Sequence, residues 1–391
     1  MQAITKHILA ILISAGALLS SCKKETAGPE SGTPANFNEL FDRFWSEMNS
    51  RYLFWDIDQT NWEAMRSKYA PIFATLDLNK TEDVKKSVGY FREMTAGLID
   101  GHYYINFLHP ALRDSIINPS RDRKQRMAGY HPRVSYASLV RARYLYLDYR
   151  EGRDNTTDPS RQVYALTGTI GGDVLYFHCN SFFLYDAWTS TKENGVKPVL
   201  EQFFRSLSTL PPAIRGIIID VRGNTGGDIS DINFLMGRLT NRNVQFGFTR
   251  YKNGAGRLDF TPWVPSYIRP LQGSAGVSVP VIALADNFSA SLAESVTLAV
   301  KQLPGGKFIG ETTWGANGPY AFNEQLYNAG PFKLTGFMEV QTSSAAFKTV
   351  DGTITEGQGV VPDIPVPFDR AAIEQGQDVI LQTALDQLRK P

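Results

Sequence analysis

The second half of the chain alternates buried-strand patterns with amphipathic-helix patterns, and this alternation narrows the possible folds most. Three short apolar runs have the pattern of fully buried strands: residues 174–177, 216–221 and 281–285. Between and after them, residues 196–207 and 290–303 repeat apolar side chains at helical spacing. Alternating strands and helices form a sheet that is covered by helices. We therefore predict an α/β (α+β) domain over residues 165–391.

Residues 37–101 have a different, purely helical pattern. An apolar face is formed by Phe37, Leu40, Phe41, Phe44, Trp45 and Met48. Asn36 and Glu39 have the spacing of a capping box at its start. We predict a small N-terminal helical domain that precedes the α/β domain.

Residues 102–164 join these two regions and show no sustained periodicity. Residues 110–161 hold ten Arg and one Lys against six acidic residues. We interpret this connecting segment as a solvated excursion with some β-ribbon, in preference to a dedicated binding surface.

The N-terminus has the pattern of an export signal. Lys6 precedes an apolar run at residues 8–19, which is too short to span a bilayer but suits a secretory signal. The run ends in small residues before Cys22, which resembles the lipobox of bacterial lipoproteins. We expect a signal peptide at 1–21, lipidation of Cys22, and a disordered tether at 22–36, where large apolar residues are absent.

Composition excludes several other classes of function. Forty Lys and Arg nearly balance 39 Asp and Glu, which argues against nucleic acid as a main partner. With five His, two Cys and no His-Glu-x-x-His pattern, we expect neither a metal nor another cofactor. Cys179 lies in an apolar run and is expected in the core.

Two predicted strand-to-helix junctions could carry chemistry, and the first is rich in glycine. The predicted strand ends in a turn that contains Gly223, Asn224, Gly226 and Gly227. Glycines allow close approach to a ligand and leave N–H groups pointing outward. Such fixed donors can build an oxyanion hole, although an ordinary glycine-rich turn has the same pattern.

The second junction carries two serines. Ser289 and Ser291 follow the predicted strand 281–285 and precede a helix. A hydroxyl near a helix N-terminus lies where developing negative charge is stabilised. Ser291 and Glu294 also have capping-box spacing, so a purely structural role explains the same residues.

Together the two junctions resemble the C-terminal processing (tail-specific) and tricorn-core serine peptidases. The pattern Asp-x-Arg-Gly-Asn-x-Gly-Gly is matched by residues 220–227, and Ser-Ala-Ser-x-x-Glu by residues 289–294. Further matches occur at 310–315 and 356–363, and upstream at 52–55, 61–62 and 98–102. The resemblance implies a ClpP/crotonase-like catalytic domain at 165–391, whereas a PDZ module is not recognisable in 102–164.

The resemblance also implies roles for single residues. The nucleophile would be Ser291, with an oxyanion hole at Gly226, Gly227 and Leu292. Tail-specific members carry a basic Lys where this chain has Ala316. The tricorn-like branch instead takes its base from a His and orients it with a Glu, which match His102 and Glu356.

These expectations describe a serine endopeptidase that is exported and anchored to a bacterial membrane through Cys22. Its partners would be peptides or unfolded polypeptides, and the sequence does not indicate an oligomeric state. The absence of Lys at 316 leaves open a catalytically inactive relative that binds peptides or apolar ligands in the same cleft. A crotonase-like acyl-CoA enzyme suits an exported chain poorly, because acyl-CoA is cytoplasmic.

Overall fold

The computed structural model describes residues 32–146, 148–319 and 330–390. Residue contacts divide the chain into two units, Met1–Gly32 and Thr33–Pro391. The predicted signal peptide, Cys22 and most of the predicted tether therefore lie outside the described residues. None of the helices in the described part of the chain combines the length and the apolar character that a membrane span requires.

Three helices form the N-terminal region, as predicted: α1 (Phe37–Arg51), α2 (Trp62–Phe73) and α3 (Thr81–Thr95). The Asn36 side chain accepts a hydrogen bond from the Glu39 N–H at 2.9 Å, which caps α1. The predicted apolar face of α1 is buried along its whole length. Aromatic rings dominate this core, and Phe73 stacks on Phe41 with ring centroids 4.9 Å apart.

A four-stranded sheet completes the core of the helical region. Its strands, in order, are β11 (Phe332–Leu334), β12 (Met338–Gln341), β1 (Tyr104–Phe107) and β2 (Ile116–Ile117). The core of the helical region thus also contains strands from the connecting segment and from the later domain. The three helices leave an apolar face, and the distant strands β11 and β12 help to cover it.

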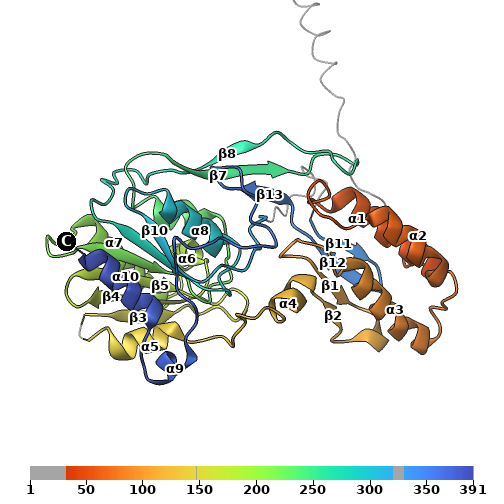
Figure 1. Ribbon diagram of the computed structural model, residues 1–391, viewed down its shortest axis with the longest axis horizontal. Coiled ribbons are helices and arrows are strands. Elements are labelled where there is room, and N and C mark those ends of the chain that lie inside the picture. The colour runs from red at the N-terminus through yellow and green to blue at the C-terminus, as the bar shows by residue number, and fades with distance from the viewer. Residues whose placement is uncertain (1–31, 147, 320–329, 391) are drawn as a thin grey trace, which may run out of the picture. The chain divides into compact units, whose positions relative to one another are not determined.

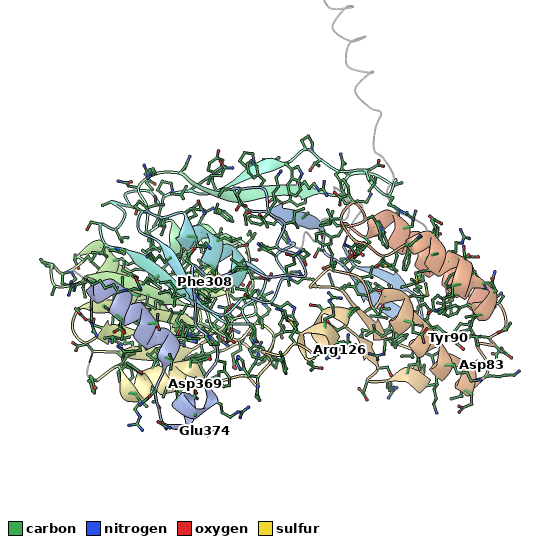
Figure 2. The ribbon with its side chains drawn as sticks, viewed as in Figure 1. Asp83, Tyr90, Arg126, Phe308, Asp369 and Glu374 are labelled. Atoms are coloured by element: carbon green, nitrogen blue, oxygen red, sulfur yellow. The ribbon has the colours of Figure 1, made fainter. Side chains whose placement is uncertain are left out.

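The arginine-rich connecting segment is more ordered than its sequence pattern indicated. It contains η1 (Pro110–Leu112), α4 (Pro119–Lys124), α5 (Tyr136–Arg143) and β3 (Arg150–Arg153). Arg126, labelled in Figure 2, follows α4. The β3 strand pairs with β4 and forms the edge of the main sheet.

A seven-stranded sheet forms the centre of the predicted α/β domain. Its order is β14 (Ile364–Pro365), β10 (Lys307–Gly310), β9 (Val281–Ala285), β6 (Gly216–Asp220), β5 (Val174–Cys179), β4 (Tyr164–Ile170) and β3. The strands from β14 to β5 are parallel, whereas β4 and β3 are antiparallel. Buried apolar residues fill β5, β6 and β9, which confirms the predicted strands.

Helices cover both faces of this sheet (Figure 1). One face packs against α7 (Val196–Ser208) and α8 (Leu292–Lys301), with α6 (Leu184–Thr189) and η2 (Ile232–Met236) nearby. The other face packs against α5 and α10 (Val379–Arg389), and α9 (Arg370–Glu374) precedes α10. A separate three-stranded sheet of β13 (Ala345–Lys348), β7 (Val244–Tyr251) and β8 (Val264–Ile268) lies beside it in Figure 1.

The sheet order places the two predicted junctions next to each other. β6 and β9 are neighbours and run parallel, with Asp220 opposite Leu284. Their carboxyl ends therefore reach the same edge of the sheet, where ligands bind in open α/β sheets.

Candidate active site

Ser289 ties the two junctions together. Its hydroxyl donates to the Val221 carbonyl at 2.8 Å, and the Asp286 N–H donates to this hydroxyl at 3.0 Å. The Ala290 N–H donates to the Asn224 carbonyl at 3.0 Å. Because Ser289 is fully buried and engaged in these bonds, its role is structural.

Ser291 is held in an unusual backbone conformation directly before α8. Its φ is +57°, a region that residues other than glycine seldom adopt. Its N–H donates to the Glu294 carboxylate at 3.1 Å, so this part of the predicted capping box is formed. Strain of this kind persists where the surroundings enforce it, and it is frequent at functional sites.

Gly226 of the first junction lies against Ser291. A Cβ on Gly226 would stand 2.6 Å from the Ser291 Cβ and 2.9 Å from the Leu292 nitrogen. The Gly226 N–H donates to the Asn224 side chain at 2.8 Å, so this amide is already engaged. The N–H groups of Gly227 and Leu292, by contrast, donate no hydrogen bond to any described residue. Of the three predicted oxyanion-hole residues, Gly227 and Leu292 retain an available amide donor. Gly226 instead allows its backbone to lie close to Ser291, because it has no Cβ.

His102 lies beside two polar partners. Its N–H donates to Asp100 at 2.9 Å, and its Nδ1 lies 3.4 Å from the Ser343 hydroxyl oxygen. Burial lowers the pKa of His102 to about 4, because a desolvated imidazolium is unfavourable. The ring is therefore neutral at pH 7, which is the form that a general base requires.

Asp100 and Ser343 form a pair that the sequence did not reveal. Both are fully buried. The Ser343 N–H and its hydroxyl each donate to the Asp100 carboxylate at 2.8 Å. Burial raises the pKa of Asp100 to about 6, against the opposing effect of these donors. Ser343 thus links a buried carboxylate to the His102 ring.

Glu356 holds backbone amides from two loops. Its carboxylate accepts from the N–H of Gly101 at 2.7 Å, of Asn317 at 3.0 Å and of Gly318 at 2.8 Å. Burial, followed by the nearby charge of Asp100, raises its pKa well above the usual range.

Asp100, His102 and Glu356 each bring an atom into one cluster, with these atoms within 4.8 Å of one another. Their residue types suit a metal ion, but N–H and O–H donors already occupy the carboxylate oxygens. In this structure the carboxylates of Asp100 and Glu356 therefore act as hydrogen-bond acceptors.

A chain of contacts connects Ser291 with His102. One oxygen of Glu294 accepts from the N–H of Ser291 and, at 2.7 Å, from the N–H of Ala316. A Cβ on Gly101 would stand 2.5 Å from the Ala316 Cβ, so the chain next to His102 passes directly over Ala316. The predicted nucleophile Ser291, base His102 and orienting residue Glu356 are thus linked through intervening backbone groups, although they come from three separate parts of the sequence.

Cys179 has the core position that was expected for it. Cys179 is fully buried, and burial raises the pKa of its thiol well above the usual range, which confirms a core residue. Lys124 lies near the position where a basic Lys is missing. Its ammonium donates to the Thr313 carbonyl at 2.8 Å, and burial lowers its pKa.

Comparison with known proteins connects this geometry to a family. Residues 173–366 match the family model of peptidase family S41, and residues 33–79 match that of the tricorn protease C1 domain. A candidate tricorn protease homolog of Streptomyces coelicolor is 29% identical over 172 residues, which is 43% of this chain. The tricorn protease of Thermoplasma acidophilum is 24% identical over 189 residues, or 48% of this chain. The matched parts span only 12% and 15% of these relatives.

Solved structures resemble most of the chain. A candidate peptidase from Parabacteroides merdae covers 92% of this chain and 97% of its own, with TM-score 0.66 and 21% identity. Mature CPAF complexed with lactacystin covers 90% of this chain and 97% of its own, with TM-score 0.60 and 12% identity. These likenesses support a shared mixed α/β fold with an N-terminal helical region.

Proposed function

Because the chain belongs to peptidase family S41, we propose that it is a serine endopeptidase with a ClpP/crotonase-like catalytic domain and the triad Ser291, His102 and Glu356. One observation carries this proposal. Ser291 is held at φ +57° against Gly226, and the amides of the adjoining residues Gly227 and Leu292 are not occupied by any described residue. A strained serine between available N–H groups suits attack on a carbonyl carbon, because the donors stabilise the oxyanion that forms.

In this mechanism His102 accepts the Ser291 hydroxyl proton and then donates it to the leaving amine. The low pKa of His102 keeps the ring neutral before the reaction. With Asp100 ionised, the Ser343 hydroxyl donates to Asp100 and its oxygen can accept from His102 Nδ1–H. That tautomer leaves Nε2 to accept the proton.

Glu356 has a different part in the proposed mechanism. Its hydrogen bonds hold Gly101, next to the base, against the loop that follows Ala316. We infer that Glu356 mainly fixes the position of His102, while Ser343 and Asp100 select the tautomer.

Labelling with a fluorophosphonate probe tests the proposal. We expect the wild-type chain to form a covalent adduct and to cleave an unfolded protein, and the Ser291→Ala variant to do neither. An alternative is an inactive relative that binds peptides or apolar ligands in this cleft, which the alanine at 316 favours. Peptide binding without adduct or turnover in the wild type would support that alternative.

We further propose that the chain is exported and anchored to a bacterial membrane by acylation of Cys22. The short apolar run and the small residues before Cys22 support this proposal. A Cys22→Ser variant should accumulate as uncleaved precursor and lose labelling by a fatty-acid analogue. Normal maturation of this variant would contradict it.

A further inference from the structure

A cavity of about 480 Å³ lies next to α5 and reaches Gly223 of the first junction. Its lining includes Arg133, Tyr136, Arg141, Arg153, His178 and Arg222. Three of these arginines belong to the connecting segment whose basic excess is evident in the sequence. We call this cavity the arginine pocket.

The arginine pocket has more positive than negative charge. Arg141 pairs with Glu151 at 3.0 Å, and Arg222 is neutralised by Asp220 and Asp378. Arg133 and Arg153 have no carboxylate partner among the described residues. Their guanidinium groups lie over aromatic rings instead, 5.2 Å from Phe288 and 5.1 Å from Tyr164. Two uncompensated guanidinium groups around one cavity favour an anion, above all a planar carboxylate.

Buried polar groups in the wall of the pocket also lack partners. His178 is 4% exposed, and its Nδ1 has no hydrogen-bond partner among the described residues. The nearest acidic oxygen, of Asp220, is 4.0 Å away, beyond hydrogen-bonding distance. The hydroxyl of Tyr136, which is 2% exposed, likewise has no described partner. Buried groups of this kind are costly unless a ligand or water satisfies them.

The pocket adjoins both catalytic junctions. Gly223 lines the pocket and lies three residues before Gly226, which packs against Ser291. Phe288, beneath Arg133, likewise lies three residues before Ser291. Three residues span at most about 10 Å of extended chain. A peptide attached at Ser291 can therefore reach the pocket with a few of its own residues.

We propose that the arginine pocket binds a carboxylate of the substrate, about two to four residues from the scissile bond. This proposal rests on the proposed peptidase function and specifies its substrate class as peptides with a carboxylate at that distance. The carboxylate is either an Asp or Glu side chain or a free C-terminus, since both present the same group.

Binding to the Ser291→Ala variant tests the pocket without requiring turnover. The probes are labelled decapeptides that carry a single Glu at different positions of the peptide. Each has a matched peptide with Gln in place of that Glu, and every peptide is made with a free and with an amidated C-terminus. We expect the favoured acidic peptide to bind about tenfold more tightly than its neutral match, as charged hydrogen bonds would produce. A Glu effect identifies a side-chain carboxylate, and an effect of amidation identifies the C-terminus.

Arg133→Gln and Arg153→Gln should each remove most of this preference and leave binding of the neutral peptide within about twofold. Both side chains are exposed, so the fold should tolerate the change. Arg205→Gln on α7 is the matched control, because it removes the same charge outside the pocket.

Equal binding of acidic and neutral peptides would contradict the proposal that the arginine pocket binds a carboxylate, even if the wild type cleaves both peptides. Arginine-dependent binding without any cleavage by the wild type would support the pocket while the proposed peptidase function fails. A loss of preference in Arg205→Gln equal to that in Arg153→Gln would also overturn it, because general electrostatics would then explain the effect.

Discussion

The N–H of Gly101 donates to the carboxylate of Glu356 at 2.7 Å, across 255 positions of sequence. This bond fixes the segment that carries His102 to the loop that carries Glu356. Together with Glu294, which bridges the N–H groups of Ser291 and Ala316, it assembles the candidate triad from distant parts of the chain.

Ser291, and not Ser289, should form the covalent adduct with a phosphonate probe. Ser291 is half-buried in a strained turn, whereas the Ser289 hydroxyl is fully buried and hydrogen-bonded to Val221. Peptide mapping by mass spectrometry identifies the modified residue. We expect Ser289→Ala to lower the free energy of unfolding by about 1–3 kcal/mol, since it leaves buried groups unsatisfied. An adduct on Ser289 would contradict the assignment.

His102→Ala should lower kcat by roughly a thousandfold or more, as loss of a triad member does, while the fold is retained. His109→Ala is the matched control, because that ring lies against Phe337 and its Nδ1 accepts a hydrogen bond from Ala111. Its turnover should stay near that of the wild type. Near-normal turnover of His102→Ala would reject His102 as base and direct attention to Lys124, whose pKa burial lowers.

Ser343→Ala should lower kcat by roughly ten- to a hundredfold and leave KM nearly unchanged, because a base that loses its orientation loses part of its catalytic contribution. Steady-state kinetics on a neutral peptide measure both constants. Ser206→Ala is the control and should behave like the wild type, because the Ser206 hydroxyl donates to the Gln202 carbonyl within α7. A Ser343 variant that loses stability but keeps kcat would indicate a structural role alone.

The pH profile of kcat/KM should have two steps on its acid side. His102 must be neutral to act, and its pKa of about 4 means that protonation abolishes activity only near pH 4. Asp100 must be ionised to accept from Ser343, and its pKa of about 6 gives a partial loss as the pH falls through 6. Asp100→Asn should remove the upper step. A single complete loss between pH 6 and 7, which an ordinary histidine would produce, would contradict this environment for His102.

Gly226→Ala should abolish activity, because the added Cβ would stand 2.6 Å from that of Ser291 and Gly226 has φ +95°. Gly172→Ala is a matched control with φ +79° and no atom within 4 Å of the added Cβ. The control should lose about 1 kcal/mol of stability from the backbone alone and keep its turnover. Activity and thermal unfolding are measured for both variants. A loss of activity in Gly226→Ala alone indicates displacement of Ser291, whereas an equal loss of stability in both variants indicates backbone strain. Equal, near-normal turnover in both would show that Gly226 does not set the position of Ser291.

The sequence by itself determined the parts of this protein that depend on neighbouring residues. The strands 216–221 and 281–285, the helical face of α1 and the core position of Cys179 follow from local apolar pattern. The two junctions were also evident, because a turn with several glycines or serines after a buried strand is a local signal.

Only the tertiary structure decided the rest. Ser343 reaches Asp100 across 243 positions, and nothing near Ser343 in the sequence indicates that contact. The engaged amide of Gly226, the available amide of Leu292 and the strands that complete the helical core depend likewise on which distant segments meet. Burial then sets the pKa of His102 and Asp100, since desolvation is a property of the packed site and not of the residue type.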